Sequence, residues 1–192
     1  RLSNNLGNQM FMYASAYVFA KKLNREFFYD DETAYQGSSL YNYNLDIFKI
    51  SSTRAPENLK FLNKFGYVKR KFLKYLDNFN SRKMFYIEPR DHNKNTSFND
   101  KILNGNYNDK LFVEGHFESE KYFNSHINDI KIEFKFKNYK SFENNQLYKD
   151  IKNSESVSVC IRQNRFSERK RPITIKDEEN SLIFTEDQVK YV

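Results

Sequence analysis

The first segment with candidate binding chemistry is an amide-rich turn near the start of the chain. Asn4-Asn5-Leu6-Gly7 is a turn-type cluster, and it precedes a helical pattern from about Gln9 to Leu23. Backbone N–H groups at a helix start, together with the positive end of the helix dipole, favour a bound phosphate. The amides of Asn8 and Gln9 add side-chain donors. A turn before a helix is also common without any ligand, so spacing alone leaves a purely structural role open.

A second segment, Glu114-Gly115-His116-Phe117-Glu118-Ser119, follows a strand predicted at Leu111–Val113. Its glycine suits a tight turn, and its serine suits the cap of a helix running to about Asn128. His116 and Glu118 are ionisable and lie at the strand end, which makes them candidates for contact with an acceptor or for a general base. A capped helix that carries a surface histidine explains the same residues.

The third segment joins an apolar run to an arginine-rich loop. Val157–Ile161 predicts a buried strand, and Arg162 follows it directly. In open α/β sheets the residues just beyond a parallel strand line the ligand crevice. A guanidinium binds a pyrophosphate through paired, charge-assisted hydrogen bonds, so Arg162 is the strongest candidate, and Arg165 extends the positive field. Basic runs of this kind are also typical of solvated loops.

Strands that alternate with helices predict an α/β layer with a mainly parallel sheet. The predicted strands are Arg25–Tyr29, Lys83–Glu88, Leu111–Val113, the alternating stretch Ile130–Phe136, for which a short linker is the alternative, and Val157–Ile161. The predicted helices include Gln9–Leu23, two after Pro56 that are separated at Gly66, and one at Leu147–Lys152. Residues 31–55 predict a long surface excursion. Thr185-Glu186-Asp187-Gln188 has the capping-box form of a helix start.

All three segments resemble signatures of the family 11 α-1,2-fucosyltransferases, and they occur in that family's order. Leu6–Phe11 matches six consecutive positions of the G-G-L-G-N-Q-M-F signature, and Asn4 and Asn5 stand at its paired glycines. The same loop is distantly similar to one in the protein O-fucosyltransferases. Asparagine tolerates a left-handed backbone better than most residues, so the turn is expected to survive. Glu114–Phe123 resembles G-Y-F-Q-S-E-K-Y-F, which follows a strand in the same family.

Val159–Phe166 is similar to the V-H-I-R-R-G-D-Y motif of the α-1,2- and α-1,6-fucosyltransferases. The first arginine of the motif is retained as Arg162. Four positions depart from the motif. Cys160 stands at the histidine position, Gln163 at the second arginine, Asn164 at the glycine and Arg165 at the aspartate. The last of these reverses a charge, so three outcomes are left open: a retuned site, a divergent subgroup of the family, or a site that has lost activity.

The resemblance implies roles for individual residues. Asn8 and Arg162 are implied as the catalytic pair, with Arg162 on the donor diphosphate. The implied donor-binding residues are Gly7, Asn8, Gln9, Arg162 and Arg165. His116 and Glu118 are the acceptor or base candidates, and neither is singled out as the base. No metal ligands and no cofactor are implied, because GDP-fucose enters as a co-substrate.

The resemblance also implies a fold and an activity. The fold is a Rossmann-like N-terminal domain of a two-domain GT-B glycosyltransferase, with the second domain mostly missing from what resembles an N-terminal fragment. Residues 1–153 would form the acceptor-side domain, and residues 154–192 would begin the donor-binding domain. The activity is metal-independent, inverting transfer of fucose from GDP-fucose to a sugar hydroxyl of a glycan, with an α-1,2 linkage, in bacterial polysaccharide biosynthesis. A catalytically silent glycan-binding or assembly homologue of the same fold is the alternative.

The formal net charge of +7 suits a polyanionic partner, although coding bias in an AT-rich genome also produces lysine-rich chains. From Lys60 to Lys74, basic residues interleave with aromatic ones, as in nucleic-acid and membrane-surface binders. Helical spacing predicts instead that the rings, Phe61, Phe65, Tyr67, Phe72 and Tyr75, are core and that the basic residues form the outer face. No nucleic-acid partner is expected. The protein is expected in the cytoplasm, with peripheral contact at the anionic inner membrane face left open.

Overall fold

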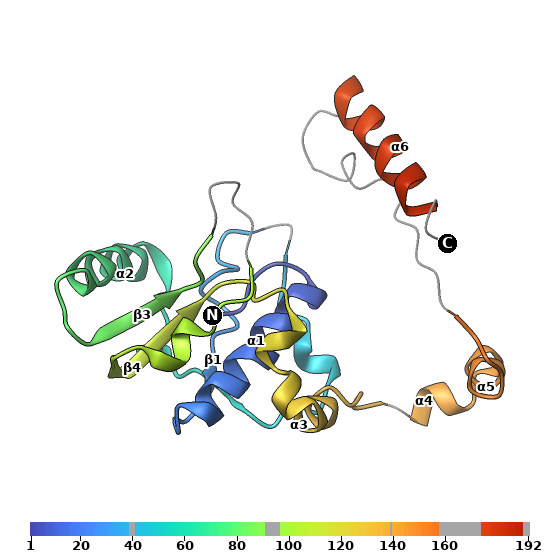
Figure 1. Cartoon of the computed structure of the whole chain (residues 1–192), viewed down its shortest axis with the longest axis horizontal. Coiled ribbons are helices and arrows are strands. Elements are labelled where there is room, and N and C mark those ends of the chain that lie inside the picture. The colour runs from blue at the N-terminus through green and yellow to red at the C-terminus, as the bar shows by residue number, and fades with distance from the viewer. Residues whose placement is uncertain (39–40, 91–96, 139, 158–173, 190–192) are drawn as a thin grey trace. The chain divides into compact units, whose positions relative to one another are not determined.

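A computed structural model describes the chain except for residues 39–40, 91–96, 139, 158–173 and 190–192 (Figure 1). The chain forms two compact units, Arg1–Tyr139 and Lys140–Val192, and each is described by itself. The domain boundary predicted between residues 153 and 154 stays a prediction.

Helices and strands are mixed through the first unit, and the elements described in the second unit are helices. In the first unit the α-helices and strands are α1 (Leu6–Lys22), β1 (Phe28–Tyr29), β2 (Thr53–Arg54), α2 (Asn63–Asp77), β3 (Lys83–Ile87), β4 (Tyr107–Glu114) and α3 (Ile127–Glu133). Its 3-10 turns are η1 (Leu45–Ile47), η2 (Glu57–Leu59), η3 (Asp100–Asn104), η4 (Glu120–Tyr122) and η5 (Asn124–His126). The second unit contains α4 (Lys140–Glu143), α5 (Gln146–Lys152) and α6 (Ile175–Val189).

The strands form two small parallel sheets, which agrees with an α/β class. One sheet pairs β1 with β2, so that Phe28 lies opposite Thr53. The other pairs β3 with β4, where Phe85 lies opposite Phe112 and the register is irregular near Lys83. Strands Lys83–Ile87 and Tyr107–Glu114 confirm the two strands predicted at these places, and the second begins four residues earlier than predicted.

Helix α1 is the centre of the core of the first unit, because aromatic side chains pack on several of its sides. The Tyr13 side chain is completely buried, and its ring contacts Phe27, Tyr29 and Phe134 at centroid distances of 5.4, 5.9 and 5.7 Å. Fully burying side chains of this size contributes roughly 1.5–3 kcal/mol each. The predicted helix is therefore confirmed, although it begins three residues earlier, at Leu6.

A different side of α1 packs against the chain that follows β4. The Phe19 ring meets Phe117 and Tyr122 edge-on, at centroid distances of 5.3 and 5.6 Å. Edge-to-face pairs add about 0.5–1.5 kcal/mol beyond the area they bury. The same helix thus connects its own N-terminal loop to the segment after β4.

The stretch at residues 31–55 is not the surface excursion that the sequence predicts. Leu45 and Phe48 lie in the core with α1, and Thr53–Arg54 forms β2. The prediction was wrong because the buried side chains are few and irregularly spaced, so the segment has no periodic pattern of its own. Its strand is only two residues long and is held by pairing with β1.

The helix break predicted at Gly66 is also wrong. One helix, α2, passes through Gly66 without interruption. Glycine is used here for close approach: a Cβ at this position would lie 2.4 Å from the carbonyl carbon of Phe61. Glycine is therefore required at position 66 for close packing, and it does not end the helix.

Residues 130–133 of the alternating stretch belong to helix α3 and not to the predicted strand, whereas Phe134 follows the helix and Phe136 makes an isolated antiparallel bridge with Phe48. In α3, Ile130 and Glu133 are buried at i and i+3, whereas Ile132 is 57% exposed. Glu133 accepts hydrogen bonds from the Tyr13 hydroxyl at 2.6 Å and from the Ser51 backbone N–H at 2.7 Å. Burial of both Ile130 and Glu133 requires helical spacing, because a strand would instead place residues 130, 132 and 134 on one face.

In the second unit, α5 confirms the helix predicted at Leu147–Lys152. The helix start predicted at Thr185–Gln188 is wrong, because these residues lie inside α6 and the Thr185 hydroxyl bonds the Ser181 carbonyl. Val157, the one described residue of the strand predicted at 157–161, is exposed and lies outside any strand. None of the described helices has the length and apolar character needed to cross a membrane.

Replacing Gly66 by alanine is expected to destabilise the first unit by about 2 kcal/mol or more, because the new methyl group overlaps the Phe61 backbone. Thermal or urea unfolding measures the effect. Gly7→Ala is the matched control: its Cβ would meet no atom within 4 Å, so it should be neutral or stabilise by up to about 1 kcal/mol. Equal stability of the two variants would contradict the packing role of Gly66.

Candidate functional site

The structure brings the first and second polar segments together at the N-terminus of α1. The Asn8 side-chain amide donates to Glu118 Oε1 at 2.7 Å. Asn4 Nδ2 lies 3.0 Å from His116 Nε2. These pairs join residues that are 110 and 112 positions apart in the sequence. Four of the side chains singled out from the sequence therefore form one polar cluster, called the amide–carboxylate site below: Asn4, Asn8, His116 and Glu118.

The backbone of the site is held in unfavourable conformations. Asn4 has a φ of 61°, which confirms that asparagine at one of the paired glycine positions adopts the left-handed turn. Asn5 is extended and is the N-cap of α1, and its side chain does not cap the helix. Phe117, between His116 and Glu118, has a φ of 51°. A left-handed bulky residue costs on the order of 1–3 kcal/mol and is often found at a binding site.

Gln9 supports the turn from inside the protein. Its side chain is completely buried, and its amide nitrogen donates to the carbonyls of Asn4 and Asn42, each at 2.8 Å. Its amide oxygen accepts from the Asn44 backbone N–H at 2.8 Å. Because the polar atoms of Gln9 serve the backbone, the structure gives this predicted donor ligand a positioning role. Gly7, by contrast, lies exposed on the first turn of α1.

Glu88 supports the loop of the site and was not predicted from the sequence. It is buried at the end of β3, and its Oε2 accepts from the backbone N–H groups of His116 and Phe117 at 2.8 and 3.0 Å. A Cβ on Gly115 would come within 2.4 Å of the Glu88 Cβ, so glycine is required beside it. The available signal was an acidic residue directly after an apolar strand and before Pro89.

The contact with the Asn4 amide fits one tautomer of a neutral His116 ring. An Asn4 amide that donates to Nε2 leaves this nitrogen unprotonated, so the ring proton lies on Nδ1. Nδ1 faces Glu118 Oε1 at 3.6 Å. A carboxylate beside Nδ1 and an unprotonated Nε2, whose lone pair here accepts from the Asn4 amide, are the features of a histidine general base. The side chains of His116 and Glu118 are 30% and 51% exposed, so solutes reach them from solvent.

An ion cluster beside the site fixes α2 to the end of β4. The Glu114 carboxylate accepts from Arg70 Nε at 2.8 Å and from Lys74 Nζ at 2.7 Å, and its side chain is 9% exposed. Burial alone would raise the pKa of Glu114, but the hydrogen bonds from Arg70 and Lys74, with the charge of Arg1, hold this pKa at about 2. The carboxylate next to Gly115 and His116 therefore stays ionised.

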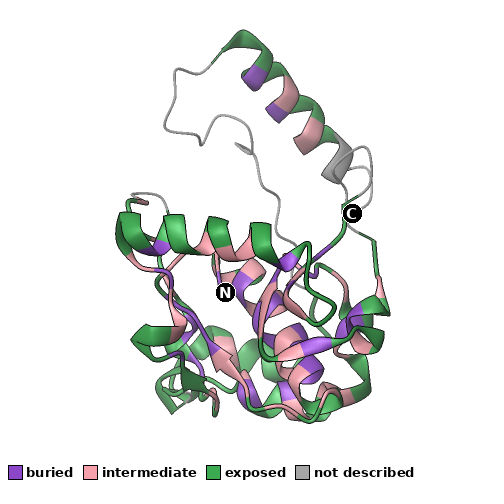
Figure 2. Ribbon diagram, turned by 90° about the vertical axis from the view of Figure 1, so that its left-hand side faces the viewer, coloured by how far each residue is buried: buried purple, intermediate pink, exposed green. Residues whose placement is uncertain are grey.

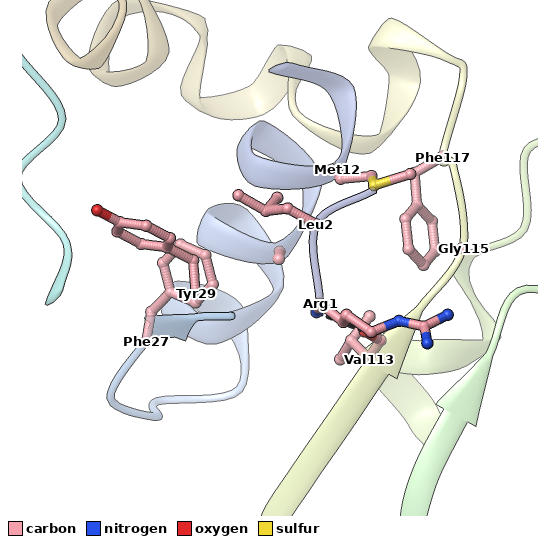
Figure 3. Close-up of a pocket in the computed structure, with 9 residues that line it drawn as sticks. Arg1, Leu2, Met12, Phe27, Tyr29, Val113, Gly115 and Phe117 are labelled. Atoms are coloured by element: carbon pink, nitrogen blue, oxygen red, sulfur yellow. Dashed lines mark hydrogen bonds between the residues drawn. The ribbon is translucent and has the colours of Figure 1, made fainter. Parts of the chain in front are cut away.

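Two cavities lie near the site, and neither is lined by the four residues of the amide–carboxylate site. The smaller, about 20 Å³, has room for one water molecule and lies beside Arg1 and Leu2, between Tyr29 and Val113 (Figure 3). The larger, about 420 Å³, is bordered by residues of β1 and β4 and by one side of α1. The four side chains of the site are themselves partly or fully exposed, so the site is an accessible polar surface.

The third predicted segment lies outside the described residues. Arg162 and Arg165 fall within 158–173, as does Cys160, so their positions relative to Asn8 stay a prediction. Among the residues that the structure describes, no group of three or more histidine, cysteine, aspartate or glutamate side chains is arranged to hold a metal ion.

Comparison with known proteins yields no match to a protein-family model, to a curated protein or to a solved structure.

The ionised Glu114 predicts how stability depends on acid. Its folded pKa of about 2 lies below the ordinary value of 4.5, so its contribution is fully present above pH 4.5 and is lost as the pH falls through about 2. Allowing for screening by solvent, the contribution is about 1–2 kcal/mol. Glu114→Gln should lower stability at neutral pH and flatten the loss between about pH 5 and pH 2, as measured by urea unfolding across this range.

Glu120→Gln removes one exposed carboxylate nearby and is the control for the change in net charge. If Glu114→Gln and Glu120→Gln give the same acid profile, the Arg70–Glu114–Lys74 cluster does not stabilise the fold.

Proposed function

We propose that the protein acts as a fucosyltransferase, transferring fucose from GDP-fucose to a sugar hydroxyl with inversion and without a metal ion. In this proposal the first unit is a Rossmann-like domain of the GT-B type. The observation that carries the proposal is the contact between Asn8 and Glu118 at 2.7 Å. It joins two segments, 110 residues apart, that resemble the same transferase family in the same order.

On the donor side, the first turn of α1 offers groups suited to phosphate. The Asn5 side chain does not cap this 17-residue helix, and Gly7 leaves the space beside its backbone open. Uncapped N–H groups and the helix dipole favour an anion at this end. Asn8 adds a side-chain amide, and buried Gln9 keeps the turn in place. Preorganised donors of this kind stabilise charge that grows on a leaving diphosphate.

On the acceptor side, His116 Nε2 is the proposed general base. The acceptor hydroxyl gives its proton to Nε2 as its oxygen bonds to the anomeric carbon of fucose, and the bond from that carbon to the diphosphate oxygen breaks. GDP leaves with the electron pair. Glu118 stabilises the imidazolium that forms, while the amide of Asn4, now 3.0 Å from Nε2, yields its place to the acceptor.

Removal of the proposed base tests this assignment. His116→Ala is expected to lower fucose transfer to a β-galactoside acceptor by about 10²–10⁴-fold, the usual contribution of general base catalysis. Release of GDP and formation of the fucosylated product are measured on the complete gene product. His126→Ala, which removes a histidine bonded to Ser125 outside the site, is the control. Equal transfer by the two variants would remove His116 from the mechanism.

Arg162→Ala tests the proposed contact with the diphosphate. Loss of one preorganised charge that stabilises the transition state costs about a hundredfold in rate. Arg169→Ala, in the same basic run, separates a specific contact from a general loss of positive charge. Calorimetry with GDP and with GDP-fucose accompanies both measurements. A natural protein that binds a glycan but neither binds nor cleaves GDP-fucose would be the silent homologue instead.

A further inference from the structure

Helix α2 turns its apolar side away from the rest of the first unit. The outward residues follow helical spacing on one face, continue one turn past the helix end and include three phenylalanines: Phe65, Val68, Phe72, Tyr75, Leu76 and Phe79. Phe65 and Phe79 are 80% and 74% exposed. In Figure 2, where α2 lies nearest the viewer, most of its ribbon is coloured as exposed. The prediction that the aromatics of this region are core is therefore wrong for all of them except Phe61.

The inward side of α2 is polar and fixes the orientation of the helix. Arg70 and Lys74 bind buried Glu114. Asp77 is buried, and its carboxylate accepts from the backbone N–H groups of Met84 and Phe85 at 2.7 and 3.0 Å. Rotation that buried the apolar face would leave these charges and N–H groups without partners, which costs several kcal/mol. The apolar face consequently stays outside.

Lysines border the apolar face on both sides. Lys64 and Lys71 lie along one border and Lys69 along the other, and all three are exposed. Within the described chain, no carboxylate lies within 4.0 Å of their ammonium groups. From residue 58 to residue 76 the sequence contains no aspartate or glutamate. The face therefore combines an apolar centre with an uncompensated positive rim.

We propose that this face of α2 binds the surface of an anionic lipid bilayer. The helix lies in the plane of the interface, with Phe65 and Phe72 below the headgroups and the lysines extended to the lipid phosphates and carboxylates. The rim is complementary to negative headgroups, and the apolar centre is complementary to the acyl region. This inference is independent of the proposed transferase activity.

Two other occupants fit the face less well. In a symmetric dimer through α2, each rim would face an identical rim, so Lys64, Lys69 and Lys71 would meet like charges. A single-stranded nucleic acid needs separate ring platforms along a basic groove. Here the aliphatic side chains of Val68 and Leu76 adjoin the rings, and the face is convex helix surface.

Binding to vesicles tests the inference directly. The complete chain should sediment with vesicles of phosphatidylcholine containing about one third phosphatidylglycerol, and binding should fall steeply between about 0.1 and 0.5 M salt. Phe65→Ser with Phe72→Ser should weaken binding at least tenfold. Leu147→Ser, at a side chain 66% exposed on α5, is the matched control and should bind as the natural chain does. Circular dichroism verifies that the variants are folded.

A fluorescence measurement locates the helix in the bilayer. The chain has no tryptophan, so Phe65→Trp provides a single reporter. Its emission should shift to the blue and be quenched by brominated acyl chains on anionic vesicles, whereas Leu147→Trp should show neither effect. Absence of vesicle binding at low salt overturns the inference. Binding that survives the loss of both phenylalanines also overturns it, as does an unshifted emission spectrum of the Phe65→Trp variant. A dimer or an RNA complex that depends on these rings, without vesicle binding, would overturn it as well.

Discussion

Burial of α1 on most of its circumference is the constraint on which the rest of the first unit depends. The completely buried Tyr13 side chain fixes the helix against β1 and α3, and Phe19 fixes it against the segment after β4. A helix held in this way cannot rotate or slide without opening several aromatic contacts, each worth about a kcal/mol beyond its buried area. The position of Asn8, on the first turn of the same helix, follows from that packing.

The geometry of the amide–carboxylate site depends on the packing of α1. Helix α1 brings the turn at Asn4, and the contacts of Asn4 with His116 and of Asn8 with Glu118 join the loop after β4 to this end of the helix, while Phe117 packs on Phe19 farther along it. Glu88 then sets the local conformation by accepting two backbone N–H groups of the loop. Buried side chains therefore fix the relative positions of the ionisable residues His116 and Glu118, as a preorganised polar site requires.

Elements with a strong local pattern could be predicted from the sequence. The helix from Leu6, the strands at Lys83 and Tyr107 and the helix at Gln146 each have clear spacing or composition. Two failures have nonlocal causes: the helix at residues 130–133 depends on the bonds of Glu133 with Tyr13 and Ser51, and the outward rings of α2 depend on the bond of Arg70 with Glu114. The contact of Gly66 with the Phe61 backbone spans only five residues, but it depends on how the chain folds back before α2, which neither residue type nor spacing reveals. For the site, residue types identified Asn8, His116 and Glu118, but their contacts and the supporting Glu88 required the fold.

The cavity bordered by β1 and β4 has a consequence for how the first unit moves. The two parallel ladders share no backbone hydrogen bond with each other in the described chain. The start of the chain bridges them, because Leu2 N–H reaches the Asp30 carbonyl and the Arg1 ammonium group reaches the Val113 carbonyl. The two ladders are therefore joined by α1 and by the first residues of the chain and not by strand pairing. Amide hydrogen exchange would then report two distinct opening events, one for β1 and β2 and another for β3 and β4, in place of a single cooperative sheet.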